Sequence, residues 1–177
     1  MGQKFESINE EHTGFIKKQK MYFVATAPVG GRINLSPKGL DTFRIMDGNR
    51  VAWLNLTGSG NETAAHLLED DRITVMFNSF DDEPLILRLY GRAVSVYPDE
   101  PEWEILAAEF PGYPGARQII DMRVEMVHTS CGFGVPLYEF RGHRETLVSW
   151  IEMKGEDGIK KYREEKNSVS MDGKKTR

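Results

Sequence analysis

Short segments rich in β-forming residues, separated by turn signals, constrain the fold of this 177-residue chain more than any other feature. Asp47-Gly48-Asn49, for example, is a typical hairpin turn between two such segments. Strands joined by connections this short pair in the antiparallel sense. The pattern predicts a mainly β protein whose six or seven strands form a sheet that closes fully or partly into a barrel. The predicted strands cover residues 21–27, 32–36, 42–46, 50–56, 72–80, 85–97 and 119–130.

Three features of these strands lead to specific predictions. Ile33 and Leu35 share one face of the strand at 32–36, while Arg32, Asn34 and Ser36 share the other, which faces either the core or solvent. Pro37 is expected to end the pairing because it lacks an N–H. Gly91, in the middle of the longest strand, predicts a bulge or a bend.

Helical patterns interrupt and follow the strands. They predict helices over residues 4–20, 101–110, 144–154 and 158–167, and a further helix that opens after residue 61 and runs to about residue 71. The polar tail over residues 168–177 is expected to fray.

Composition excludes several classes of protein. Hydrophobic residues make up 40% and charged residues 28% of the chain, as in ordinary globular domains. The net charge of −4 argues against a nucleic-acid partner. No apolar run is long enough to span a bilayer, and the first residues lack the apolar core of a secretory signal. The single cysteine, Cys131, cannot form an internal disulfide. We therefore expect a soluble, cytoplasmic protein.

The turn at residues 57–61, Thr-Gly-Ser-Gly-Asn, combines hydroxyls with glycines and opens a predicted helix. Ser59 and Glu62 fit the capping box, in which serine accepts from a first-turn N–H and glutamate reaches back. Free N–H groups at a helix start attract anions, and phosphate in particular. The alternative is a cap that binds nothing, since every helix needs one.

No catalytic constellation is visible in the sequence. The four histidines are scattered without a metal-binding spacing, so we expect no metal site. The adjacent acids Asp70-Asp71 and Asp81-Asp82 are typical of solvated turns. Cys131 is either a reactive thiol or an inert small side chain. Catalytic residues therefore stay unassigned, and if the protein is an enzyme, a cofactor would carry the chemistry.

Two stretches, RINLSPKG at residues 32–39 and WLNLTGSGNETAAHL at residues 53–67, resemble the pyridoxamine 5'-phosphate oxidase-like family of FMN-binding split-barrel proteins. RITVMF at 72–77, LRLYGRA at 87–93 and SCGFGVP at 130–136 resemble it in the same order. The resemblance implies a six-stranded antiparallel split β-barrel with flanking helices, formed by residues 1–141. Residues 142–177 would add a helical C-terminal extension. The resemblance also implies a homodimer with FMN at the subunit interface.

The resemblance further implies a cofactor site. The strand at 32–36 would lie along the flavin ring, with Lys38 near the ring or the phosphate. Asn55 and Leu56 would contact the ring and the ribityl chain, and the turn at 57–61 would hold the phosphate. The expected cofactor-binding residues are Arg32, Ile33, Asn34, Leu35, Ser36, Lys38, Asn55, Leu56, Thr57, Ser59 and Asn61.

Two departures from the family's oxidase limit what the resemblance implies about the reaction. Gly60-Asn61 stand where the oxidase has a basic pair, and the chain ends SMDGKKTR without the oxidase's arginine motif for the substrate phosphate. The expected function is therefore flavin-mediated redox of a small molecule rather than oxidation of pyridoxine phosphate. Alternatives are a deazaflavin- or haem-binding barrel and a flavin-binding module without turnover. Trp150 would either reach the partner's flavin site or anchor its own helix.

Overall fold

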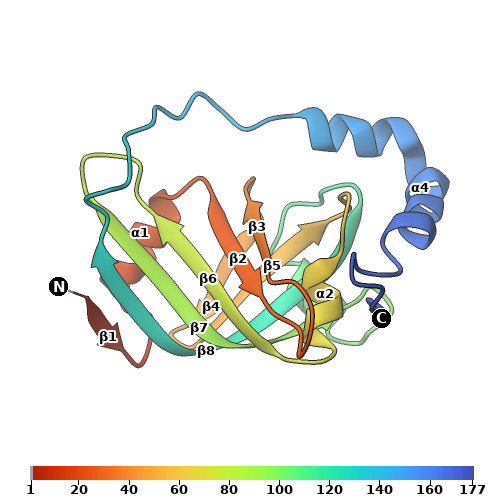
Figure 1. Cartoon of the computed structure of the whole chain (residues 1–177). Helices are drawn as coiled ribbons and strands as arrows, with labels where there is room; N and C mark the ends of the chain where they lie inside the picture. Colours follow the sequence, from red (N-terminus) through yellow and green to blue (C-terminus); the bar gives the residue numbers. More distant parts are fainter. Residues whose placement is uncertain (1) are drawn as a thin grey trace.

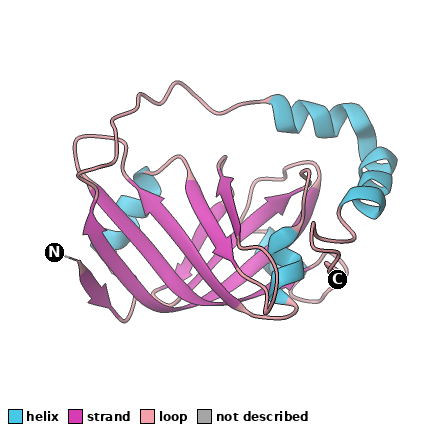
Figure 2. Ribbon diagram, viewed as in Figure 1, coloured by secondary structure: helices cyan, strands magenta, loops and turns pink. Residues whose placement is uncertain are grey.

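A computed structural model describes residues 2–177 as one curled antiparallel sheet with helices at its margins (Figures 1 and 2). The sheet has eight strands, two more than the six that the family resemblance implies. The hydrogen-bonded order is β3-β2-β6-β7-β8-β5-β4, with β1 paired to β8. The edge strands β3 and β4 do not pair with each other, so the barrel is split. The strands are β1 (Gln3–Phe5), β2 (Tyr22–Thr26), β3 (Asn34–Lys38), β4 (Phe43–Asp47), β5 (Arg50–Leu56), β6 (Arg72–Asn78), β7 (Leu85–Val96) and β8 (Ala116–Cys131).

Alternation along the strands builds the core. In β6, Ile73, Val75 and Phe77 are buried, whereas Arg72 and Thr74 lie on the other face. An aromatic cluster fills the barrel around the fully buried Trp53, and it also contains Tyr22, Phe43 and Phe77. Apolar burial of this extent is the main stabilising term for such a sheet.

Gly91 produces the predicted bulge. The register of β7 against β8 shifts between Tyr90 and Gly91. A Cβ atom on Gly91 would overlap the carbonyl oxygen of Arg123 in β8. Only glycine therefore allows the two backbones to approach this closely.

The edge strand β3 continues past Pro37, contrary to the prediction. Pro37 pairs with Phe23 and Lys38 with Tyr22. Strand β3 lies at the edge of the sheet, where a backbone N–H can point outward without a partner. A proline at such a position, which has no N–H, leaves the pairing intact.

The first helix begins later than predicted, and the second begins where predicted but ends at Leu67 instead of about residue 71. Asn9 caps α1 (Glu10–Lys18) through reciprocal bonds with His12, so the residues before it are free to form β1. Helix α2 (Glu62–Leu67) has Asn61 at its N-cap position without a side-chain cap bond. The predicted Ser59–Glu62 capping box is therefore absent, because the Glu62 carboxylate instead accepts from the Met171 N–H at 3.0 Å.

Helix α3 (Trp103–Ala107) is shorter than predicted, and α4 (Thr146–Lys166) combines the two predicted C-terminal helices. They join at a kink where Gly155 has φ 66°. Trp150 packs edge-on against Tyr162 across this kink, with ring centroids 5.0 Å apart, so it braces its own helix. Residues 132–145 contain no helix or strand and cross from β8 to α4 (Figure 1). None of the helices in residues 2–177 is both long and apolar enough to cross a membrane.

The C-terminal strap, residues 168–177, is ordered against the barrel and does not fray as predicted. A bridge between Val169 and Lys175 closes it into a loop, and Ser170 and Thr176 are buried. Tyr97 donates to the Thr176 carbonyl at 2.7 Å, and Lys174 pairs with Glu69 at 2.6 Å. These long-range bonds fix a segment whose composition alone is typical of a loose tail.

Candidate functional site

Three segments enclose a cavity of about 610 Å³. Its size is usual for a small-molecule site. The segments are the inner face of β3, the turn at residues 57–61 with the start of α2, and the end of α4 with the strap, and residues of β5 and β8 complete the lining. We call this space the β3 cavity. It is lined by Asn34, Ser36, Lys38, Asn55, Leu56, Gly58, Ser59, Gly60, Asn61, Glu62, Thr63, Arg117, Lys166, Val169, Ser170 and Met171.

Alternation along β3 decides which side chains reach the cavity. Asn34 and Ser36 point toward it, and the Ser36 hydroxyl donates to Asn34 Oδ1 at 2.9 Å. Asn34 Nδ2 donates to Thr63 Oγ1 of α2 at 3.2 Å. Ile33 and Leu35 lie on the opposite face with 77% and 64% of their surfaces exposed. The polar face of this strand therefore lines a site rather than open solvent.

Lys38 closes the β3 side of the cavity. Its Nζ donates to Asn55 Oδ1 at 3.0 Å, and it forms no ion pair within residues 2–177. Burial, reinforced by the charge of Arg117, lowers the pKa of Lys38 to about 8. Lys38 is thus a cation that an anionic ligand would help to keep protonated.

The turn at residues 57–61 presents Ser59 and Asn61 to the cavity. Asn61 Oδ1 accepts from Gln118 Nε2 at 2.7 Å, which fixes the amide. Thr57 does not line the cavity, because its buried hydroxyl donates to the Gly115 carbonyl at 2.9 Å and accepts from Arg163 Nε at 2.8 Å. Helix α2 contains only six residues, so its dipole adds little and the positive charge must come from elsewhere.

Arg117 of β8 supplies that charge from beneath the turn. It is 6% exposed, and its Nη1 donates to the Gly60 carbonyl at 3.0 Å and to Asn167 Oδ1 at 2.6 Å. Its Nε has no partner among the described residues. Burial, with the nearby charge of Arg163, lowers its pKa to about 10, so the guanidinium stays charged at neutral pH. A buried cation without a counter-ion is costly, and an anion in the cavity would offset that cost.

Four cations therefore bond to the turn or line the cavity beside it, and we call them the basic cluster. None of them forms an ion pair within the part of the chain that the structure describes. The basic cluster consists of Lys38, Arg117, Arg163 and Lys166. Such a concentration of unpaired charge beside hydroxyl and amide donors is suited to a phosphate.

The structure brings together most of the residues expected at the site. Those that line the β3 cavity are Asn34, Ser36, Lys38, Asn55, Leu56, Ser59 and Asn61. Four of the expected residues do not line the cavity. Arg32 pairs with Asp172 of the strap, Ile33 and Leu35 face outward, and Thr57 is buried.

The sequence did not point to Arg117, Lys166 or the strap residues. The predicted strand began at Ile119, whereas β8 begins at Ala116 and carries the polar pair Arg117-Gln118 into the interior. Two polar residues directly before an apolar strand were the available signal. Nothing local marks Lys166, which reaches the cavity only because α4 folds back over the barrel.

A smaller cavity of about 310 Å³ adjoins the first and shares Lys38, Asn55, Leu56 and Gly58 with it. Its far side carries His143 and Leu147, from the segment before α4 and from α4 itself. The Lys38–Asn55 pair thus stands between the two spaces.

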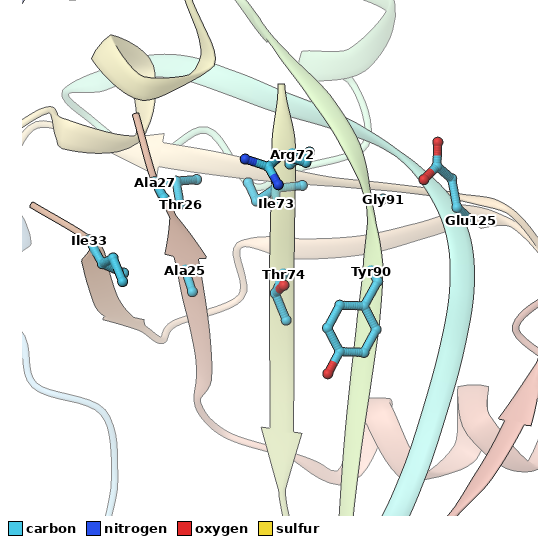
Figure 3. Close-up of a pocket in the computed structure, with 10 residues that line it drawn as sticks. All are labelled: Ala25, Thr26, Ala27, Ile33, Arg72, Ile73, Thr74, Tyr90, Gly91 and Glu125. Carbon is cyan, nitrogen blue, oxygen red and sulfur yellow. The ribbon is translucent and has the colours of Figure 1, made fainter. Parts of the chain in front are cut away.

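A shallow trough lies on the face of the sheet turned away from the core (Figure 3). Small side chains such as Ala25 and Thr74 form its floor, and Tyr90 and Ile33 flank it. It is mainly apolar and offers no cluster of charged groups for a cofactor. Within residues 2–177, His, Cys, Asp and Glu side chains form no group of three that could hold a metal.

Comparison with known sequences gives two matches. The model of the family described as pyridoxamine 5'-phosphate oxidase matches residues 8–131. A pyridoxamine 5'-phosphate oxidase family protein of Aspergillus flavus, ustO, is 38% identical over 147 residues, covering 80% of this chain and 59% of the Aspergillus protein. The chain thus matches less than two thirds of that relative's length.

Solved structures with low sequence identity share the fold. A protein of Lactobacillus delbrueckii classed with the pyridoxamine 5'-phosphate oxidases gives a TM-score of 0.55 at 18% identity, covering 70% of this chain and 94% of that one. A FAD-binding protein of Mesorhizobium loti gives 0.52 at 11%, covering 73% and 96%. HutZ of Vibrio cholerae, a haem storage protein, gives 0.52 at 16%, covering 71% and 97%.

Proposed function

The chain belongs to the pyridoxamine 5'-phosphate oxidase family, and on this basis we propose that it binds FMN in the β3 cavity and uses it in redox chemistry on a small molecule. The observation that carries this proposal is Arg117, a buried and unpaired cation directly beneath a turn of hydroxyl and amide groups. A terminal phosphate matches this arrangement in charge and in its need for several donors.

Each part of the cavity suits a different part of the cofactor. Ser59 and Asn61 would bond the phosphate, with the basic cluster providing the charge. The inner face of β3, with Asn34 and Ser36, offers polar groups along which the ribityl chain and ring would lie. Lys38 would then stand near the ring or the phosphate, where a protonated amine stabilises negative charge.

Bound FMN supplies electron or hydride transfer, which the side chains of this protein do not supply themselves. The protein's contribution is to hold the group, exclude water and place Lys38 and Asn55 between the β3 cavity and the adjoining space. That adjoining space of about 310 Å³ would admit a small substrate beside the cofactor.

Titration of the cofactor-free protein with FMN and, in parallel, with riboflavin tests the proposal. The two ligands differ only in the phosphate, so FMN should bind at least about tenfold more tightly if the basic cluster holds that group. Equal affinities would show that the phosphate is held elsewhere or is not held at all. Reduction of bound FMN under anaerobic conditions by nicotinamide cofactors would then separate an oxidoreductase from a module without turnover.

Ser59→Asp is expected to weaken FMN binding about tenfold while leaving riboflavin binding unchanged. The new carboxylate would face the phosphate, and like charges repel by about 1 kcal/mol or more at a solvated site. Ser59 does not cap α2, whose N-cap position is Asn61, so the fold should tolerate the change. Fluorescence titration measures the affinities, with the uncharged Ser59→Asn as control. If the aspartate variant binds FMN as tightly as the parent, the phosphate does not lie at this turn.

FMN affinity is also expected to fall as pH rises through about 8, the lowered pKa of Lys38. Below that pH the lysine is already charged in the free protein. Above it, binding of an anion must take up a proton, which costs at most about tenfold in affinity per pH unit. Lys38→Met should remove this dependence. If the FMN affinity of the parent changes with pH above 8 in the same way as that of the methionine variant, the anion lies away from Lys38.

We also propose that the protein is a homodimer with the cofactor close to the subunit interface. Strand β3 carries polar groups toward the cavity and the exposed Ile33 and Leu35 on its outer face. Ile33 also borders the apolar trough of Figure 3, so the apolar surface continues beyond β3. Leu35→Glu is expected to yield monomers and to weaken FMN binding. Light scattering that gives one chain per particle for the parent would contradict the dimer.

A further inference from the structure

The C-terminal strap lies at the same end of the β3 cavity as the turn that would hold the phosphate. Asn167 Nδ2, directly before the strap, donates to the Gly58 carbonyl at 3.1 Å. The Met171 N–H donates to the Glu62 carboxylate at 3.0 Å, directly after Asn61. Val169, Ser170 and Met171 form the cavity wall there. The strap therefore covers the space beyond the turn.

Long-range contacts hold the strap in this position. Asp172 accepts from the Arg32 N–H at 2.8 Å and pairs with its guanidinium, which ties the strap to the loop before β3. Lys174 pairs with Glu69 beyond α2. Arg177 pairs with Asp99 in the turn after β7 at 2.5 Å. Figure 1 shows the C-terminus lying against this side of the barrel near α2.

The strap is also braced internally. Ser170 is 5% exposed, and its Oγ accepts from the N–H groups of Asp172 at 3.2 Å and of Lys174 at 3.1 Å. Opening the strap would break this loop together with its ion pairs. The strap is therefore an ordered wall of the cavity and differs in this from a loose chain end.

Flavin mononucleotide and flavin adenine dinucleotide differ at this end of the cofactor. The mononucleotide ends in a phosphate monoester, whereas in the dinucleotide the same phosphorus continues through a second phosphate to adenosine. The dinucleotide thus needs open space beyond the phosphate site. The Glu62 carboxylate stands on that side and would repel a second phosphate.

From these contacts we propose that the C-terminal strap makes the site specific for a flavin mononucleotide by closing it to a dinucleotide. The proposal rests on the proposed function and adds the determinant of cofactor choice. The barrel alone does not make this choice, since a FAD-binding protein shares the fold. Specificity here comes from a steric and electrostatic block against the larger ligand.

The test compares FMN and FAD affinities of the full chain with those of a variant ending at Asn167. The full chain is expected to prefer FMN by at least about tenfold, and the shortened variant to bring the two affinities within roughly threefold, mainly by tighter FAD binding. Flavin fluorescence measures both, and circular dichroism checks the fold. Lys18→Ala is the control, because it removes an exposed ion pair with Glu83 that involves neither the strap nor the cavity lining, and it should leave the ratio unchanged.

A second variant covers the case in which the shortened chain does not fold. Asp172→Ala combined with Lys174→Ala keeps the length of the chain but removes two of the strap's ion pairs. The ratio of FMN affinity to FAD affinity should fall at least about threefold in this double variant. An unchanged ratio in a folded variant overturns the strap's role while leaving FMN binding in place. Equal affinities of the full chain for both flavins also overturn it. Failure of the full chain to bind any flavin removes the proposed function itself.

Discussion

Arg117→Met is expected to weaken FMN binding by roughly 10- to 100-fold, because hydrogen bonds to a charged group contribute about 1.5–3 kcal/mol and each 1.4 kcal/mol is about a factor of ten. Arg117 is the buried member of the basic cluster, so its charge is screened least by solvent. Methionine fills a similar volume without charge. Titration of the variant with FMN gives the loss directly.

Riboflavin is the control for this variant. It lacks the phosphate, so its affinity should change less than about threefold if Arg117 acts on that group. Arg117 also holds the Gly60 carbonyl and Asn167, so thermal unfolding must be recorded alongside. Equal losses for FMN and riboflavin in a folded variant would mean that Arg117 shapes the cavity without contacting the phosphate.

Gly91→Ala is expected to destabilise the fold by about 3 kcal/mol, which lowers the melting temperature by roughly 6–12 °C for a chain of this size. The added methyl group would overlap the carbonyl oxygen of Arg123 in the paired strand. Backbone in the middle of a sheet cannot move aside as a flexible side chain can. Differential scanning calorimetry measures the change.

Gly14→Ala is the matched control, since it adds the same methyl group. No atom lies within 4 Å of the position that the new Cβ would take in helix α1. Alanine favours the helix over glycine by about 1 kcal/mol, so this variant should be as stable as the parent or slightly more stable. If both variants melt at the parent's temperature, β7 and β8 do not approach each other at the bulge as closely as the structure has them.

Local sequence patterns were sufficient for most of the sheet. Period-two alternation located the strands, the alternating faces of β3 and the bulge at Gly91, because these depend on neighbouring residues alone. The cavity-lining side chains Asn34 and Ser36 were placed on one face for the same reason, whereas Lys38 was expected at the site only from the family resemblance, because the predicted strand ended before it. Once β3 is a strand, its polar residues must share one face.

Features that depend on distant contacts were missed or wrong. The capping box failed because Glu62 bonds to the strap, 109 positions further along the chain. The strap was expected to fray because its polar composition does not reveal its partners Arg32, Glu69 and Asp99. Thr57 was expected at the phosphate, but Arg163 of α4 binds its hydroxyl.

The missing basic pair of the turn has a structural counterpart. Gly60-Asn61 carry no charge, yet Arg117 from β8 and Lys166 from α4 reach the same cavity. Positive charge is thus present at the turn although it comes from residues far away in the sequence. This explains how a turn without lysine or arginine can still suit a phosphate.

Whether this protein carries FMN can be read from the mass of the compound that is released when the purified protein is denatured. We predict FMN, at up to one molecule per chain, with the visible spectrum of an oxidised flavin before release. Release of haem or of a deazaflavin would contradict the claim. A colourless protein that takes up no FMN on titration would contradict it equally.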